Sequence, residues 1–259
     1  MVHVGLAWFG VVGLNHGLYY HVQVDSVHYI HNPTKTTMIT NEMKSSQGQI
    51  TATSLQMRCG RSATLLDGVL TLTECLQLLE EAKKRGYEEA LVNIGGGRQI
   101  LKPDLRKGDR CIINDAMTAE AFFHRIREHL PAAKGLNNEK RLIGLSERMR
   151  FLAYNKGDYF KPHYDGSNSR PDGSASSWMT VMVYLDDGEK DFDGGRTLFL
   201  RESTGWGFLG DTLKIEHAII PKSGRVLVFD HDMYHAGEDV AGGTKHCIRM
   251  DVMYAWPTR

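Results

Sequence analysis

The C-terminal half of the chain alternates short apolar runs with turn-forming residues. Aromatic and β-branched residues fill these runs, and Gly, Asp and Asn bound them, which is the composition of strands. The clearest runs are Met149–Tyr154, Thr180–Leu185, Glu216–Ile220 and Arg225–Phe229. Roughly six to eight strands of ordinary length fit between residues 147 and 256. Because no helical pattern separates them, we predict an antiparallel double-sheet jelly roll rather than a parallel sheet.

Residues 60–145 carry the helical patterns of the chain. Thr71–Glu74 is a capping-box sequence, and the apolar residues that follow it recur at helical spacing. Lys83–Gly86 then supplies a basic last turn and a glycine stop. A second helix is expected over Thr118–Leu130, and Pro131 would end it. We therefore predict a mainly β protein whose jelly roll is supported by N-terminal α-helices.

A chain of 259 residues has room for one domain and an N-terminal extension. We expect the extension at residues 1–58 and the domain at residues 59–256, with the jelly-roll core over 146–256. Within the extension, Leu6–Leu14 is apolar, but it is too short to span a bilayer and lacks the basic flank of a signal peptide. Asn32–Ala52 is polar and rich in Ser and Thr, which predicts a poorly ordered linker.

The charges of the chain balance to a formal net charge of zero. Nothing in this balance draws the protein to nucleic acid or to an anionic membrane. The charged stretch Lys102–Arg110 is predicted to be a solvated loop, with Arg106 or Arg110 facing a substrate groove as the alternative. The cysteines are scattered without metal-type pairs, which favours a reducing compartment, cytoplasmic or nuclear, and leaves the secretory pathway open.

His163 and Asp165 are the strongest chemical signal in the sequence. Residues two apart in a strand point to the same face, so an imidazole and a carboxylate at this spacing can reach one ion. We expect the third ligand to be His235, while His231, four residues upstream, is the competing histidine. Two imidazoles and one carboxylate leave open positions on a metal, as in non-haem Fe(II) oxygenases. The alternative interpretation is an exposed histidine beside a turn aspartate.

Two cations, Lys245 and Arg249, lie in the strand predicted after His235. If that strand runs beside the one that carries His235, the Lys245 side chain points into the same cavity. A keto-diacid such as 2-oxoglutarate, chelating iron at one end, needs a cation for its far carboxylate, and a buried ammonium supplies it. Arg249 shares the face of Lys245 by strand parity, so it is the alternative anchor or a second polar contact.

Four stretches of the chain, in order, resemble the prolyl-hydroxylase-type branch of the Fe(II)/2-oxoglutarate dioxygenases. They are Met149–Asp165, Met179–Leu185, Asp193–Phe199 and Gly224–Lys245. The resemblance covers residues 141–256, somewhat under half of the chain, and implies a double-stranded β-helix (jelly roll) fold. One departure is Arg249, a bulky cation where the family often has a smaller residue.

The same resemblance assigns roles to individual residues. It implies that His163, Asp165 and His235 bind Fe(2+). It implies further that Lys245 binds the distal carboxylate of 2-oxoglutarate, and that two tyrosine hydroxyls line the co-substrate pocket. These two residues are Tyr154 and Tyr184.

The resemblance implies a dioxygenase that uses O2 and 2-oxoglutarate to hydroxylate an organic substrate, with release of succinate and CO2. The expected substrate is a prolyl or other residue of a protein or peptide, and ascorbate is implied as an accessory reductant. Two alternatives remain: the same chemistry on a small molecule or nucleobase, and a non-catalytic jelly roll that senses metal or dicarboxylate. Substrate choice is expected to lie in the loops Gly166–Ser177 and Arg201–Lys214.

Overall fold

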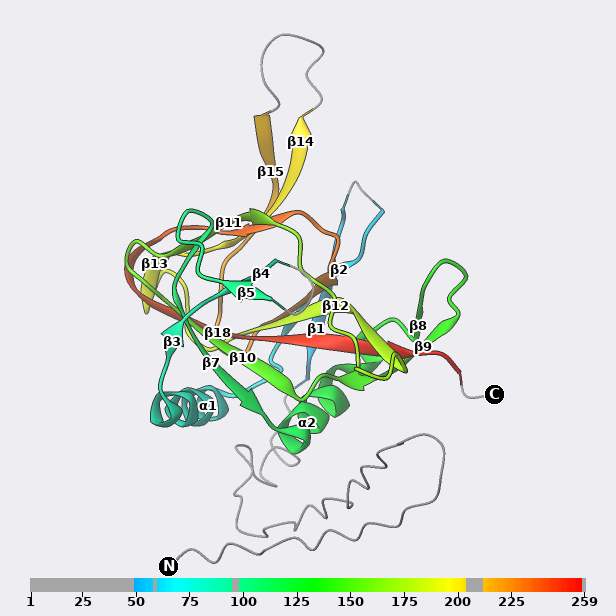
Figure 1. Cartoon of the computed structure of the whole chain (residues 1–259). Helices are drawn as coiled ribbons and strands as arrows, with labels where there is room; N and C mark the ends of the chain where they lie inside the picture. Colours follow the sequence, from blue (N-terminus) through cyan, green and yellow to red (C-terminus); the bar gives the residue numbers. More distant parts are fainter. Residues whose placement is uncertain (1–48, 58–59, 95–97, 204–211, 258–259) are drawn as a thin grey trace, which may run out of the picture. The chain divides into compact units, whose positions relative to one another are not determined.

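The computed structural model of the protein describes residues 49–57, 60–94, 98–203 and 212–257 (Figure 1). Leu6–Leu14, most of Asn32–Ala52 and the middle of the loop Arg201–Lys214 lie outside these residues. The helices are α1 (Leu72–Arg85), α2 (Ala116–Ile126) and the short 3-10 helix η2 (Arg127–His129). None of the described helices is long and apolar enough to cross a membrane.

Strands make up most of the described chain. In order they are β1 (Thr51–Leu55), β2 (Ala63–Asp67), β3 (Glu88–Glu89), β4 (Val92–Asn93), β5 (Gln99–Ile100), β6 (Arg106–Lys107), β7 (Asp109–Asn114), β8 (Ala133–Lys134), β9 (Lys140–Leu145), β10 (Arg148–Asn155), β11 (Tyr159–His163), β12 (Ala175–Tyr184), β13 (Phe192–Gly194), β14 (Thr197–Ser203), β15 (Thr212–Ile219), β16 (Val226–Asp230), β17 (His235–Gly237) and β18 (Val240–Ala255).

Two antiparallel sheets form the core of the fold. The large sheet has 11 strands: eight follow the path β1-β2-β16-β12-β18-β10-β7-β3, β13 and β9 also pair β18, and β8 pairs β9. The small sheet has five strands in the order β15-β14-β17-β11-β6. Non-consecutive neighbours such as β12 and β18 or β11 and β17 show that the chain crosses repeatedly between the sheets. The predicted mainly β, antiparallel jelly roll is confirmed.

Side-chain alternation along the large sheet produces two separate cores. On β10, Met149 and Phe151 pack with the buried faces of α1 and α2. The intervening residues Leu152 and Tyr154 belong to a second buried cluster with residues of the small sheet such as Phe199. Because successive side chains of a strand point to opposite faces, the large sheet is covered by helices on one face and by the small sheet on the other (Figure 1).

The first predicted helix forms as expected from its ends. The Glu74 amide donates to Thr71 Oγ1 at 3.3 Å, and the Thr71 amide donates to the Glu74 carboxylate at 2.8 Å, which completes the capping box. The second helix begins at Ala116, two residues earlier than predicted, because the Asp115 carboxylate accepts from the amide of Met117 at 3.0 Å. It ends at Ile126, where η2 continues the turn.

Residues 60–145 also contribute strands that the helical patterns did not predict. β2 pairs β16, and β7 pairs β10, so both extend the large sheet. β1 lies within the predicted N-terminal extension and joins the sheet by pairing β2. Between residues 147 and 256 the described chain contains nine strands, rather than six to eight, because β13 and β17 are only three residues long.

Candidate metal centre and co-substrate pocket

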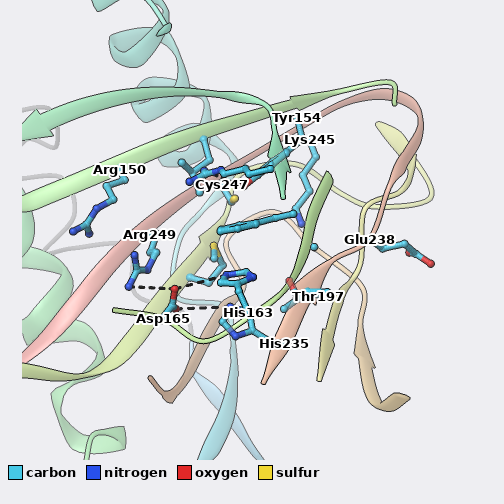
Figure 2. Close-up of a pocket in the computed structure, with 16 residues that line it drawn as sticks. Arg150, Tyr154, His163, Asp165, Thr197, His235, Glu238, Lys245, Cys247 and Arg249 are labelled. Carbon is cyan, nitrogen blue, oxygen red and sulfur yellow. Dashed lines mark hydrogen bonds and ion pairs between the residues drawn. The ribbon is translucent and has the colours of Figure 1, made fainter. Parts of the chain in front are cut away.

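Three potential metal ligands meet between the two sheets. His163 is the last residue of β11, and His235 is the first residue of the neighbouring strand β17, directly opposite in register. Asp165 Oδ1 lies 3.9 Å from His163 Nε2, and Asp165 Oδ2 lies 3.8 Å from His235 Nε2. One ligand atom from each residue lies within 4.8 Å of the others, and Figure 2 shows the three side chains converging. Two imidazoles and one carboxylate at this spacing suit a single divalent ion.

Backbone contacts fix which nitrogen of each histidine faces the cluster. His163 Nδ1 lies 2.7 Å from the carbonyl of Lys161, and His235 Nδ1 lies 2.9 Å from the carbonyl of Met233. A carbonyl only accepts, so each Nδ1 carries the proton and each Nε2 presents its lone pair to the cluster. This is the tautomer that a metal requires, and the side chains therefore fit an Fe(II) ion before any ion is bound.

The protonation states of the cluster also favour a cation. Burial lowers the pKa of His163 to about 3, with the neighbouring His235 imidazole as a further cause. Burial likewise lowers the pKa of His235. Burial alone would raise the pKa of Asp165, but Arg249, the two histidines and the hydrogen bond from Thr180 together outweigh it and hold that pKa below its usual value. Two neutral imidazoles and one carboxylate are the ligand forms that bind metal.

Asp165 reaches the cluster by a route that strand alternation did not predict. β11 ends at His163, so Asp165 lies beyond the strand rather than on its face. Its position is set instead by the Thr180 hydroxyl, which donates to Oδ2 at 2.5 Å, and by its own amide, which donates to the carbonyl of His231 at 3.0 Å. The His231 ring does not join the cluster, since its Nδ1 lies 3.0 Å from the carbonyl of Gly166.

Lys245 enters the same pocket, but from the opposite sheet. The expectation that its strand lies beside the one carrying His235 is wrong: β18 pairs β10 and β12, whereas β17 belongs to the small sheet. Lys245 is only 5% exposed, and its ammonium donates to the carbonyl of Gly195 at 2.6 Å. Burial lowers its pKa. The ammonium therefore faces the cluster of His163, Asp165 and His235 across the gap between the sheets (Figure 2).

The pocket between the sheets has an empty volume of ≈ 630 Å³, including its opening to solvent. The three candidate ligands and Lys245 line it, together with Leu152, Met182 and other side chains. Glu238 is also in the lining, but its carboxylate is held by Arg196 at 2.7 Å, so the Lys245 charge stays available for a ligand. A pocket of this size with a few converging polar groups is typical of small-molecule sites.

The two tyrosines of the predicted co-substrate pocket differ in position. Tyr154 lines the pocket, and its hydroxyl accepts a hydrogen bond from Arg106 Nη2 at 3.0 Å. The hydroxyl of Tyr184 is 2.8 Å from Thr197 Oγ1 and is fully buried, so Thr197 lines the pocket in its place. The Tyr184 ring still lies 5.7 Å from the Lys245 ammonium.

Arg249 lies next to the metal cluster rather than next to Lys245. Its Nη2 is 3.3 Å from Asp165 Oδ1 and 3.2 Å from Asp251 Oδ1. Arg150 lies beside it in the register of β10 and β18, and donates to Asp251 Oδ2 at 3.0 Å. The sequence pattern gave no signal for Arg150 or for Thr180, because each reaches the site only through strand pairing.

The predicted solvated loop Lys102–Arg110 is wrong at both of its candidate arginines. Arg106 lies in β6, which pairs β11, and its guanidinium stands 4.7 Å from the ring centroid of Phe160 in the pocket. The Phe160 ring in turn stacks on the metal-cluster histidine His163 at 3.5 Å. Arg110 is 8% exposed and donates to Glu88, away from the pocket. Residues 102–105 lie outside any strand as predicted, whereas strand pairing brings Arg106 into the pocket, as the alternative prediction had it.

Comparisons with known proteins bear on this site. The sequence profile described as the 2OG-Fe(II) oxygenase superfamily matches residues 149–250, which include all three candidate ligands and Lys245. This part of the chain is therefore similar to members of that superfamily. A similar protein is the 2-oxoglutarate and iron-dependent oxygenase domain-containing protein 3 of Xenopus tropicalis, 26% identical over 221 residues. The match covers 74% of this chain and 62% of that protein, so the chain spans less than two thirds of the relative's length.

Solved structures share the fold of this chain. The collagen prolyl hydroxylase of Paramecium bursaria Chlorella virus-1, solved as a 2-oxoglutarate complex, matches with a TM-score of 0.50 and 21% identity over 77% of this chain and 99% of its own. A prolyl hydroxylase of Trichoplax adhaerens, in complex with a peptide fragment of hypoxia inducible factor, matches with a TM-score of 0.50 and 18% identity, covering 74% and 83%. The match to this superfamily implies Fe(2+), 2-oxoglutarate and O2 as cofactors.

Proposed function

We propose that this oxygenase hydroxylates a prolyl or other residue of a protein or peptide, consuming 2-oxoglutarate and O2 and releasing succinate and CO2. The observation that carries the proposal is the position of Lys245. Its buried ammonium faces the cluster of two histidines and one aspartate across a single pocket. A keto acid that chelates an ion at one end and bears a carboxylate at the other matches both features.

Each of these residues has a definite task in the proposal. His163, Asp165 and His235 would hold the iron, which, when bound, supplies the activation of dioxygen. Lys245 would hold the far carboxylate of 2-oxoglutarate, using the protons that it does not donate to Gly195. The iron at one end and the Lys245 ammonium at the other would thereby fix the orientation of 2-oxoglutarate in the pocket.

Apolar side chains between the two ends would enclose the methylene carbons of 2-oxoglutarate. Leu152 and Cys247 face each other in the register of β10 and β18, two residues from Lys245 and two from Arg249 along the strand, and both line the pocket. Cys247 is buried, and burial raises the pKa of its thiol, so it acts as a neutral apolar wall. This wall excludes water from the reacting atoms.

A peptide substrate is supported by the fold and by the loops around the pocket. The structurally similar Trichoplax adhaerens enzyme was solved with a peptide bound. In the present chain, residues 164–174, which include Asp165, form an irregular segment between β11 and β12. Loops positioned by a rigid sheet are the usual place for substrate recognition.

The proposal is tested by measuring 2-oxoglutarate consumption and succinate formation with Fe(II) and O2, with no added substrate and then with peptide mixtures. We expect uncoupled turnover that disappears in His235→Ala and persists in His231→Ala. Mass spectrometry of the peptides should then show products heavier by one oxygen. Binding of 2-oxoglutarate without any succinate, at saturating iron, would instead favour a non-catalytic sensor. Oxidation of only small molecules or nucleobases would overturn the peptide part of the proposal.

A further inference from the structure

The pocket has cations at both ends of one strand pair. On the face of β10 and β18 that points into the pocket, Tyr154 lies opposite Lys245, Leu152 opposite Cys247, and Arg150 opposite Arg249. Four residues along a strand correspond to about 13 Å, so Lys245 and Arg249 are well separated. Figure 2 shows Arg150 and Arg249 on one side of the metal cluster and Lys245 on the other. We call Arg150 and Arg249 the arginine corner.

This inference rests on the proposed function. In that function the far carboxylate of 2-oxoglutarate does not reach the arginine corner. The keto acid would extend from the cluster past the apolar pair Leu152 and Cys247 to Lys245. The corner lies on the other side of the cluster, next to Asp165, yet both arginines still line the same pocket. Their side chains keep 20% and 17% exposure, so a molecule entering the pocket can reach them.

The charges at the corner are unbalanced once the cluster holds its ion. Arg249 contacts two carboxylates, Asp165 at 3.3 Å and Asp251 at 3.2 Å, while Arg150 contacts only Asp251, at 3.0 Å. The charge of Asp165 is then directed to the metal, and the chelating carboxylate of the keto acid neutralises the rest of the metal charge. Two guanidinium groups therefore share the one remaining carboxylate, Asp251, which is completely buried.

The hydrogen bonding of the corner is also incomplete, since Asp251 Oδ1 pairs with Arg249 Nη2 only as an ion pair at 3.2 Å and makes no hydrogen bond within the described residues. Arg249 Nε is buried and has no hydrogen-bond acceptor in the part of the chain that the structure describes. A buried cation with an unsatisfied donor is costly, and a further acceptor with negative charge would relieve both costs. Guanidinium groups match the planar geometry of a carboxylate better than any other side chain.

We propose that the arginine corner binds a carboxylate of the primary substrate, beside the iron and opposite to the 2-oxoglutarate anchor. The hydroxylated residue is then an acidic one, or it directly adjoins an acidic side chain or a chain-terminal carboxylate. The close contact of Arg249 with Asp165 places this carboxylate next to the metal, so the oxidised carbon lies within a few bonds of it.

The test uses the full-length protein loaded with Mn(II) and saturating 2-oxoglutarate, because Mn(II) is paramagnetic and the complex does not turn over. The probes are N-acetyl-aspartate amide and N-acetyl-asparagine amide, which differ only in the side-chain acid. The paramagnetic relaxation of their methylene protons, followed over a concentration series, gives each dissociation constant. We expect the acid to bind about tenfold more tightly than the amide, which is the gain from one charge-assisted hydrogen bond.

Two variants assign the preference to the corner. Arg150→Gln and Arg249→Gln should each remove most of the preference for the acid. Arg150 does not contact the metal cluster, so its variant stays informative even if Arg249→Gln disturbs Asp165. The matched control is Arg148→Gln, which removes the same charge from the same strand but from a residue outside the pocket lining, and it should keep the preference.

Three results would overturn the proposal. The first is equal relaxation of the two probes in the wild-type complex. The second is an acid preference that survives in both corner variants. The third is an acid preference that saturating 2-oxoglutarate abolishes, since the acid would then occupy the co-substrate pocket. Succinate formation without added substrate is measured in parallel, so failure of the carboxylate subsite is distinguished from failure of the dioxygenase function itself.

Discussion

The Arg106 guanidinium donates a hydrogen bond to the Tyr154 hydroxyl, with 3.0 Å between Nη2 and Oη. A guanidinium has no acceptor, so the tyrosine oxygen accepts in this bond and its own proton must point elsewhere. Tyr154 lines the pocket beside Lys245, its partner across the strand pair. If 2-oxoglutarate binds as proposed, we expect its far carboxylate to accept the tyrosine proton.

From this relationship we predict that Tyr154→Phe raises the apparent KM for 2-oxoglutarate by about tenfold, because one hydrogen bond to a charged group is worth roughly 1.5–3 kcal/mol. Tyr184→Phe should change this KM much less, since its hydroxyl contacts Thr197 rather than the pocket space. Initial rates of succinate formation at saturating iron measure both. An equal increase in the two variants would show that the tyrosine ring environment, and not the Tyr154 proton, sets the affinity.

Lys245→Ala should raise the KM for 2-oxoglutarate by at least about tenfold, since it removes the buried ammonium that would bind the far carboxylate. Arg249→Ala should raise it less, because Arg249 contacts Asp165 and Asp251 on the other side of the cluster. The comparison requires saturating iron, so that altered metal affinity does not appear as altered KM. If Arg249→Ala had the larger effect, the anchor would have been assigned to the wrong end of the pocket.

The metal cluster gives a prediction with a sharp internal control. His163→Ala, Asp165→Ala and His235→Ala should each abolish Fe(II)-dependent turnover and weaken Mn(II) binding, measured by relaxation of solvent water. His231→Ala should retain both properties, because its ring contacts Gly166 instead of the cluster. A chelator should inactivate the wild-type protein, and added Fe(II) should restore it. If His231→Ala lost metal binding and His235→Ala kept it, His231 would be the distal ligand in place of His235.

The sequence predicted which side chains converge better than it predicted how they meet. The spacing of His163 and Asp165 correctly marks two side chains that converge, although Asp165 lies past the end of β11. Alternation within a strand was thus the wrong reason for a useful prediction. The decisive contacts of Asp165 come from Thr180 and the His231 carbonyl, which are distant in sequence and depend on tertiary structure.

For the cations of the pocket, the sequence predicts the face of the strand but not the strands that lie beside it. Strand parity correctly places Lys245 and Arg249 on one face, since β18 is a continuous strand. Parity cannot say which sheet a strand joins, so the neighbour of β18 was predicted wrongly. Arg106 was expected in a loop because β6 is only two residues long and has no periodicity to detect. The positions of Lys245, Arg249 and Arg106 all depend on strand pairing between segments that are distant in sequence.

The two helices that support the large sheet are linked by a buried ion pair, and this gives a prediction on stability. Arg125 of α2 donates to the Glu74 carboxylate of α1 at 2.6 Å, and the two side chains are only 7% and 8% exposed. Glu74→Gln should lower the free energy of unfolding at neutral pH by about 3–5 kcal/mol, since it leaves a buried guanidinium without its counter-charge. Glu80→Gln, at an exposed pair with Lys84 on the same helix, should change it very little.

The pH dependence of this effect has a definite sign. Burial alone would raise the pKa of Glu74, but the hydrogen bond and charge of Arg125 and the hydrogen bonds from Thr71 together outweigh it and hold the pKa below its ordinary value. A depressed carboxylate pKa contributes stability that is complete above the unfolded pKa of about 4.3 and is lost as the pH falls through the lower folded pKa. The difference in unfolding free energy between wild type and Glu74→Gln should therefore be constant from about pH 5.5 to pH 8 and shrink below about pH 4. Denaturant unfolding of the two proteins across this range measures it, and a difference that grows on acidification would contradict the assignment of Glu74 as the charged partner of Arg125.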